Sequence, residues 1–179
     1  MIGASHVIGL SFVSVILGLF LFTATITAME GFAYVMHRWV MHGRIGWWLH
    51  ASHHRARTGM FELNDLYGVI FAIPSIMLIY LGVQGNWGWP ATAIGAGIAG
   101  YGAVYFGFHD IIVHRRIDHR IVPRSAYFKR IVQAHRIHHA VESRLGTVSF
   151  GFITAPPVEV LKARLAVSHE ATIRAPARS

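Results

Sequence analysis

The chain has 179 residues, and 54% hydrophobic residues with a mean hydropathy of +0.45 exclude an ordinary soluble domain. The absence of cysteine excludes disulfides, iron–sulfur clusters, thiolate-ligated haem and cysteine-based zinc sites. The net charge of +8 does not indicate a nucleic-acid partner, because all Lys and Arg residues lie at or after Arg38 rather than along the whole chain. We therefore expect a single membrane-embedded domain over residues 1–179, with its motifs in 30–161 and a polar tail in 162–179.

Three apolar segments are each able to cross a bilayer as a helix, which takes about 20 residues. The first covers residues 7–29, and because no basic region or cleavage site accompanies it, we expect it to be retained. The second covers residues 66–83 and carries Pro74, which kinks a helix but is tolerated inside a membrane. The third covers residues 91–108 after a short turn, so the second and third segments form a hairpin.

A further apolar stretch, residues 145–161, is an alternative fourth crossing. Pro156, Pro157 and Glu159 instead favour a re-entrant or interfacial element there. The sequence therefore predicts an all-α integral membrane bundle with three transmembrane helices, a fourth being the alternative, and a histidine-rich helical cap.

The basic residues indicate the orientation, since Lys and Arg accumulate in short cytoplasmic loops. They follow the first and third segments, whereas the N-terminus and the turn at 84–90 carry none. We therefore expect residues 30–65 and 109–179 on the cytoplasmic side of the membrane.

Each of the two cytoplasmic regions carries the pattern HxxxxH followed by HxxHH. The ten histidines are His37, His42, His50, His53, His54, His109, His114, His135, His138 and His139. In a helix, positions i, i+3 and i+4 share one face, so each HxxHH motif can present three imidazoles to a metal. The HxxxxH pairs lie about 140° apart on an α-helix, so either they bind different metals or the helix is distorted there.

Ten imidazoles exceed the four ligands that one zinc ion takes, so the sequence predicts at least two metals or a redundant ligand shell. Neutral imidazole suits Zn, Cu, Fe and Ni, and spacing alone does not choose among them. We interpret His6, His119 and His169 as ordinary solvated or hydrogen-bonded side chains.

Metal-bound histidines often donate their second N–H to a carboxylate, for which Asp110 and Asp65 are the candidates. The alternative is that both pair with nearby arginines. Glu30, at the end of the first segment, could face the bundle interior, where an ionisable group needs a partner. The third segment carries small residues at i, i+4 spacing, which favours close helix packing over a slot for a substrate.

These motifs resemble those of the bacterial β-carotene hydroxylases, in the fatty acid hydroxylase and sterol desaturase superfamily of membrane di-iron enzymes. The resemblance covers residues 30–157 and includes HRWVMHG, WWLHASHH, FELNDLYGVIFA, FHDIIVH, HRIHHAVESR and GTVSFGFITAPP. It implies hydroxylation of β-ionone rings at C3 with O2, through β-cryptoxanthin to zeaxanthin, with the ten histidines holding two Fe ions. Asn64 of the NDLY motif joins Asp65 and Asp110 as a candidate catalytic residue.

The electrons must come from another protein, because the sequence has no dinucleotide, flavin or cluster-binding motif. The resemblance implies a reduced ferredoxin, and the basic stretch 115–136 could steer such an acidic partner, although membrane topology explains the charge equally well. Rival interpretations are a ketolase, sterol desaturase or fatty acyl hydroxylase with the same motifs, a haem-binding electron-transfer protein, and a metal transporter. The sequence does not indicate the oligomeric state.

Overall fold

The computed structural model describes residues 11–174, and no strand forms within them; a single bridge pairs Val141 with Ile173. The elements in chain order are α1 (Phe12–Val35), η1 (Met36–Met41), α2 (Trp47–His50), α3 (Asp65–Val83), α4 (Gly88–Tyr105), η2 (Phe106–Val113), α5 (Ala126–His139) and α6 (Val158–Ala166). The labels η1 and η2 denote π-helices that continue α1 and α4 without a break. The all-helical prediction is confirmed.

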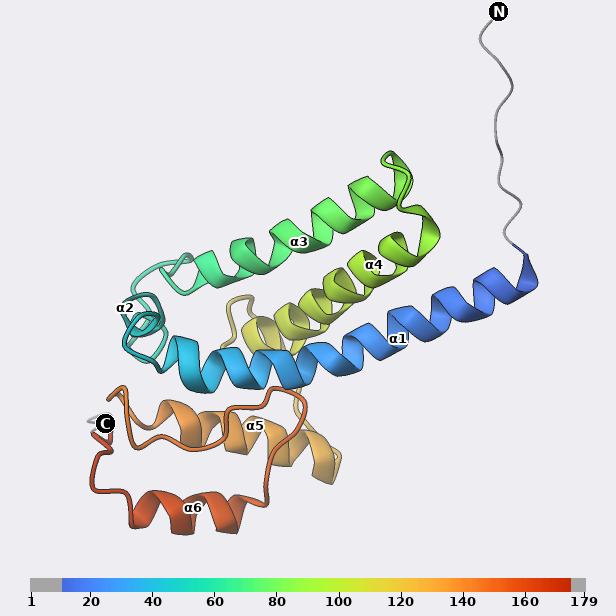
Figure 1. Cartoon of the computed structure of the whole chain (residues 1–179). Coiled ribbons are helices and arrows are strands. Elements are labelled where there is room, and N and C mark those ends of the chain that lie inside the picture. The colour runs from blue at the N-terminus through green and yellow to red at the C-terminus, as the bar shows by residue number, and fades with distance from the viewer. Residues whose placement is uncertain (1–10, 175–179) are drawn as a thin grey trace, which may run out of the picture.

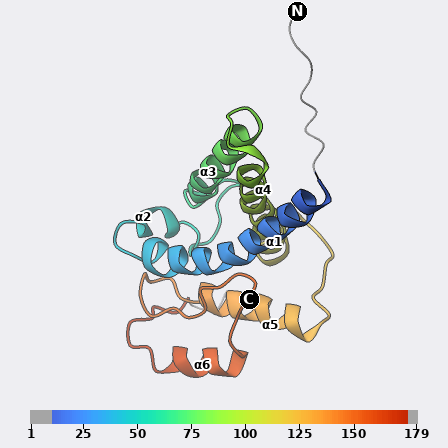
Figure 2. The same cartoon turned by 45° about the vertical axis from the view of Figure 1, so that its right-hand side comes forward.

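The helices lie on both sides of α1. The hairpin of α3 and α4 packs on one side, while α5 lies along the C-terminal half of α1 on the other, with α6 beyond it (Figures 1 and 2). The short helix α2 lies near the junction of α1 and α3. The histidine-bearing segments therefore gather at one end of the bundle.

Within residues 11–174, three helices are long and apolar enough to cross a membrane: Phe12–Met41, Asp65–Val83 and Gly88–Val113. At 1.5 Å per residue, the 30 residues of the first give a length of roughly 45 Å, against about 30 Å of hydrocarbon. The ends that carry His37 and His109 can therefore extend past the apolar layer. The prediction of three spans is confirmed; residues 7–10 of the first predicted span, and His6, lie outside the described part.

The apolar stretch 145–161 does not form a fourth spanning helix. Residues up to Pro157 are irregular, and the nine-residue α6 begins only at Val158. Since proline lacks the N–H that a helix interior needs, Pro156 and Pro157 account for this late start. The irregular part instead returns to the bundle, where Phe152 packs against Ala33 and Tyr101.

Small residues of α4 allow both neighbouring helices to approach closely. A Cβ atom on Gly97 would lie 2.6 Å from Thr25 Cβ and 2.9 Å from the Phe22 carbonyl oxygen, both on α1. A Cβ atom on Gly95 would lie 2.9 Å from the Ser75 carbonyl oxygen of α3. Small residues at such contacts are typical of helix pairs in membranes, where packing drives association.

We predict that Gly97→Ala destabilises the protein by about 1–3 kcal/mol, because the added methyl forces α1 away from α4. Gly31→Ala is the matched control, because a Cβ atom there meets nothing within 4 Å. Thermal unfolding in detergent measures both, at roughly 2–4 °C per kcal/mol for a chain of this size. Equal melting temperatures for the two variants would contradict the close α1–α4 contact.

Candidate metal centre

The ten histidines of the paired motifs converge on one interior region, and eight of them are buried. The first histidine group consists of His37, His42, His50 and His138, whose candidate ligand atoms all lie within 4.8 Å of one another. The second histidine group consists of His53, His109, His114, His135 and His139, under the same limit. His54 forms a third set with His138 and His139, and so lies between the two groups.

The π-helices explain how each HxxxxH pair reaches a single group. In η1 the His42 amide donates to the His37 carbonyl oxygen at 3.0 Å, and in η2 the His114 amide donates to the His109 carbonyl oxygen at 2.9 Å. This i→i+5 bond widens the turn, so that residues five apart face the same way. The expected helix distortion is present, and each pair stays within one group.

The HxxHH motifs, by contrast, divide between the groups. His50 joins the first group and His53 the second, while His138 joins the first and His135 and His139 the second. Each group therefore combines histidines from both halves of the chain. Correct assembly requires α2 and α5, far apart in sequence, to meet.

The outward nitrogens of seven rings have fixed hydrogen-bond acceptors. In the first group, Nδ1 of His37, His42 and His138 donates to the carbonyl oxygens of Phe150, Arg144 and Val148 at 2.9, 2.9 and 3.0 Å. Nδ1 of His50 donates to Asn64 Oδ1 at 2.7 Å, and Nδ1 of His54 to the Val141 carbonyl oxygen at 2.7 Å. In the second group, carboxylates accept instead: Glu62 from His53 at 2.8 Å and Asp110 from His109 at 3.1 Å.

These bonds leave lone pairs facing each other. A neutral imidazole whose Nδ1 donates has an unprotonated Nε2. The Nε2 atoms of His42 and His138 are nevertheless 3.3 Å apart, and those of His53 and His109 are 3.0 Å apart. Two acceptors at this distance repel each other unless a cation lies between them.

Burial keeps the rings neutral. Desolvation lowers the pKa of His42 to about 4, that of His54 to about 3 and that of His114 to about 4. Near neutral pH these rings therefore do not accept the proton that would relieve the repulsion. A metal ion relieves it, because unprotonated imidazole nitrogen is a ligand for transition metals.

Two unpartnered atoms support the same assignment. Nε2 of His37 and Nε2 of His139 are buried and have no hydrogen-bond partner within the described part of the chain. One belongs to each histidine group. A nitrogen-only donor set in two clusters fits a pair of ions such as iron, and rings this close together leave no space between them for a haem.

The predicted polar residues take different positions around the centre. Asn64 and Asp110 contact His50 and His109, as described above. Asp65 accepts two hydrogen bonds from Arg116 and none from a histidine, as expected if this carboxylate pairs with an arginine. The carboxylate that accepts from His53 is Glu62 instead. Burial raises the pKa of Glu62, and Arg116 opposes this shift. The sequence does not distinguish Glu62 from Asp65, because the choice depends on how the loop before α3 folds back.

His119 and His169 lie outside the three histidine sets. The His119 ring bonds the backbone, with Nε2 donating to the Ile111 carbonyl oxygen at 2.8 Å and Nδ1 accepting from the Ile121 amide. His169 is exposed. His6 lies outside the described residues.

Glu30 has the interior position that its location suggested, and its partners belong to the loop after α5. Its Oε1 accepts from the backbone N–H groups of residues 152–154 at 3.0–3.1 Å, and Oε2 accepts from the Tyr101 hydroxyl at 2.8 Å. The same loop provides the carbonyl groups that hold His37 and His138. Glu30 thus fixes one wall of the first group, and Phe152 stacks on the His37 ring at 5.1 Å.

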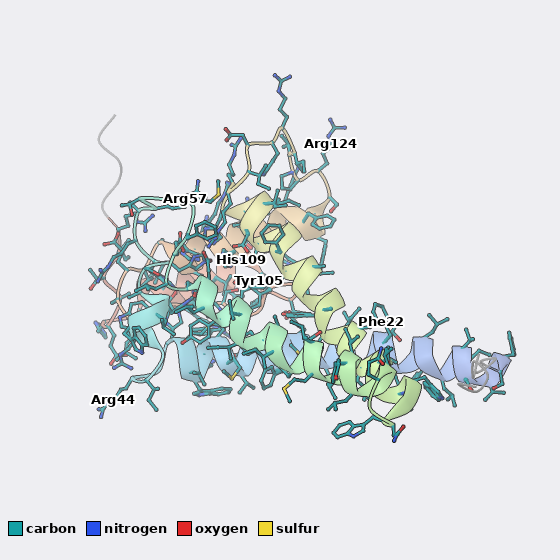
Figure 3. All side chains as sticks on the ribbon, turned by 90° about the horizontal axis from the view of Figure 1, so that it is seen from above. Phe22, Arg44, Arg57, Tyr105, His109 and Arg124 are labelled. Atoms are coloured by element: carbon teal, nitrogen blue, oxygen red, sulfur yellow. The ribbon has the colours of Figure 1, made fainter. Side chains whose placement is uncertain are left out.

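A cavity of about 590 Å³ lies between α1, α3 and α4, and its lining includes residues that contact the histidines. Its sides are apolar and include Phe32, Phe71, Ile76, Ile98 and Ala99. Its other lining residues include Asn64, Asp110, Arg116, Tyr105 and Phe152. Tyr105 stacks on His109 with ring centroids 4.4 Å apart, and Figure 3 shows the two side by side. An apolar ligand in this cavity would have one end against Tyr105 and Asp110, which contact His109 of the second group.

Comparisons with known proteins identify a family of hydroxylases and several similar relatives. The profile of the fatty acid hydroxylase family matches residues 22–156. The chain is 51% identical over 147 residues to a β-carotene hydroxylase of Pantoea ananas, which is 82% of each chain. It is 51% identical over 140 residues to a β-carotene hydroxylase of Paracoccus sp. (strain PC1), covering 78% of this chain and 85% of that one.

A more distant relative is chloroplastic β-carotene hydroxylase 1 of Capsicum annuum, 36% identical over 130 residues, or 72% of this chain and 40% of that protein. No solved structure matches the chain.

We predict that His42→Ala and His114→Ala each remove at least one bound metal ion, because each deletes a nitrogen from one group. His119→Ala is the control, since its ring lies outside the histidine groups and bonds backbone atoms of Ile111 and Ile121. Elemental analysis of purified protein measures the metal content per chain. Unchanged metal content in both variants would contradict the grouping.

Proposed function

This chain belongs to the fatty acid hydroxylase family, and on that premise we propose that it hydroxylates the β-ionone rings of β-carotene at C3. The products are β-cryptoxanthin and then zeaxanthin. About half of the residues are identical to bacterial β-carotene hydroxylases over roughly four-fifths of the chain. The observation that carries the proposal is the apolar cavity whose lining includes side chains that contact His37, His50 and His109, and so reaches both histidine groups through them.

The histidines would hold two iron ions. His37, His42, His50 and His138 would bind one, and His53, His109, His114, His135 and His139 the other, with His54 at their boundary. With O2 and two electrons, the irons would supply the oxidant for an unactivated C–H bond, which no side chain can supply. The protein itself has to bind and orient the ring and exclude water.

The cavity residues account for that binding. β-Carotene is an apolar rod dissolved in lipid, so lateral entry between the spanning helices avoids any passage through water. The apolar side chains of α1, α3 and α4 would surround the polyene, while Phe152 and Tyr105 would lie between the terminal ring and the histidines. Since close packing fixes position, this arrangement would select the ring carbon that reacts.

We predict that expression in a host that makes β-carotene converts the pigment to β-cryptoxanthin and zeaxanthin. His138→Ala is the inactive control, because this ring belongs to the first group. Chromatography of the extracted pigments measures the products. Echinenone would indicate a ketolase instead, and unchanged β-carotene would indicate a different lipid substrate.

We propose that the irons receive electrons from a reduced ferredoxin at the cytoplasmic face. Arg124, Lys129 and Arg130 are exposed on or just before α5, whose C-terminal end carries His135, His138 and His139. Figure 3 shows Arg124 at the edge of the molecule, and Arg44 and Arg57 around the end that holds His109. Such positive charge beside the centre suits an acidic donor, and the same charge supports the cytoplasmic assignment of this end.

We predict that combined reversal of Arg124, Lys129 and Arg130 to Glu lowers kcat/KM for ferredoxin by about tenfold at low ionic strength, because steering is lost. The metal content should not change. Lys162→Glu with Arg164→Glu is the matched control on α6, where both side chains are also exposed. Wild-type kinetics for the triple variant at every salt concentration would exclude docking on α5.

A further inference from the structure

Arg116, two residues after His114, is bound to three carboxylates from different segments. Its guanidinium makes two hydrogen bonds to Asp65. Its Nε lies 3.2 Å from Asp110 Oδ1, and its Nη2 lies 3.6 Å from Glu62 Oε2. The Arg116 side chain is only 9% exposed, so these charges are poorly screened by water.

Two of these carboxylates hold histidines of the second group. Glu62 accepts from His53 Nδ1, and Asp110 accepts from His109 Nδ1, while the Nε2 atoms of the two rings meet at 3.0 Å. Arg116 therefore contacts both rings indirectly, through one carboxylate each. It is also fixed by its own backbone, because its amide donates to the Asp110 carbonyl oxygen at 2.9 Å.

The first group has neutral hydrogen-bond acceptors in place of the carboxylates that Arg116 holds beside the second group. Every acceptor described for its Nδ1 atoms is neutral, being a backbone carbonyl or the amide of Asn64. A carboxylate acceptor makes an imidazole a stronger donor to a metal than a neutral acceptor does. The two groups therefore differ in the charge around them although both contain only histidine.

We propose that Arg116 is a positioning residue for the second histidine group alone, and that it makes the two metal positions inequivalent. Without its charge, Glu62, Asp65 and Asp110 repel one another, and the carboxylates turn away from His53 and His109. The metal at the second group is then held more weakly, while the metal at the first group keeps its neutral acceptors. The inference rests on the proposed two-metal centre.

The test measures iron binding to purified full-length protein, not activity. Arg116→Gln removes the charge, and Arg116→Lys keeps the charge but loses the two-pronged contact with Asp65. Asp65→Asn loosens Arg116 without removing a hydrogen bond to any histidine, because within residues 11–174 the Asp65 carboxylate accepts from Arg116 and from the Glu62 backbone amide. Arg120→Gln, an exposed arginine on the same loop, is the matched control.

Iron titration with elemental analysis, and Mössbauer spectra of ⁵⁷Fe-loaded protein, give the number and kind of bound ions. We expect two inequivalent irons in the wild type and in Arg120→Gln. In Arg116→Gln, one iron should bind with about 10- to 100-fold lower affinity while the other is unchanged, with smaller losses of that same iron in Arg116→Lys and Asp65→Asn.

Two results would overturn the proposal: wild-type affinity for both irons in Arg116→Gln, or equal weakening of both. If Arg116→Gln does not fold, the affinities of the two irons in Arg116→Lys and Asp65→Asn test the proposal in the same way. Fewer than two irons in the wild type and in Arg120→Gln would overturn the two-metal centre itself, and the role of Arg116 with it.

Discussion

Ten imidazoles lie together at one end of the bundle, eight of them buried, and several of their Nε2 atoms face one another. Seven rings donate outward through Nδ1, so their Nε2 atoms are left as acceptors, in places only 3.0–3.3 Å apart. Buried polar atoms without a partner destabilise a fold, and proton uptake is opposed by the same burial. Cations among the rings would relieve this repulsion, and under the proposed two-iron centre the rest of the fold serves to position the ligands of two metal ions.

Separate elements of the fold position different histidines of the centre. The π-helices align histidines five residues apart, and α2 and α5 bring the two halves of the chain to a shared centre. Glu30, within the first spanning helix, holds the loop whose carbonyl groups orient His37 and His138. The apolar cavity between α1, α3 and α4 lies against residues that contact the histidines, among them Tyr105 and Phe152.

Much of this could be predicted from the sequence because it depends on local periodicity. The three spans follow from apolar length, whereas each HxxHH motif divides between the two groups instead of presenting its three imidazoles to one of them. The pairing across the chain could not be predicted, because the assignment of His50 and His53 to different groups depends on how α2 meets α5. The positions of Glu62 and Asp65 were likewise set by one loop, whose path local residue preferences do not determine.

From the sequence, a helix distortion at the HxxxxH pairs was one of two alternatives, the other being that the two histidines bind different metals. The spacing of His37 and His42 does not fit one face of an α-helix, but it does not specify a π-helix. The role of Glu30 depended on a partner loop more than a hundred residues away. Long-range contacts of this kind have no sequence signature in a single chain.

The most direct test is a crystal or cryo-cooled structure of iron-loaded protein with anomalous diffraction data collected at the iron edge. We expect two iron peaks in each chain, at about the 3.5–4 Å separation of two-metal sites. One should lie within reach of His37, His42, His50 and His138, and the other within reach of His53, His109, His114, His135 and His139. A single peak, or iron bound outside these histidines, would contradict this expectation.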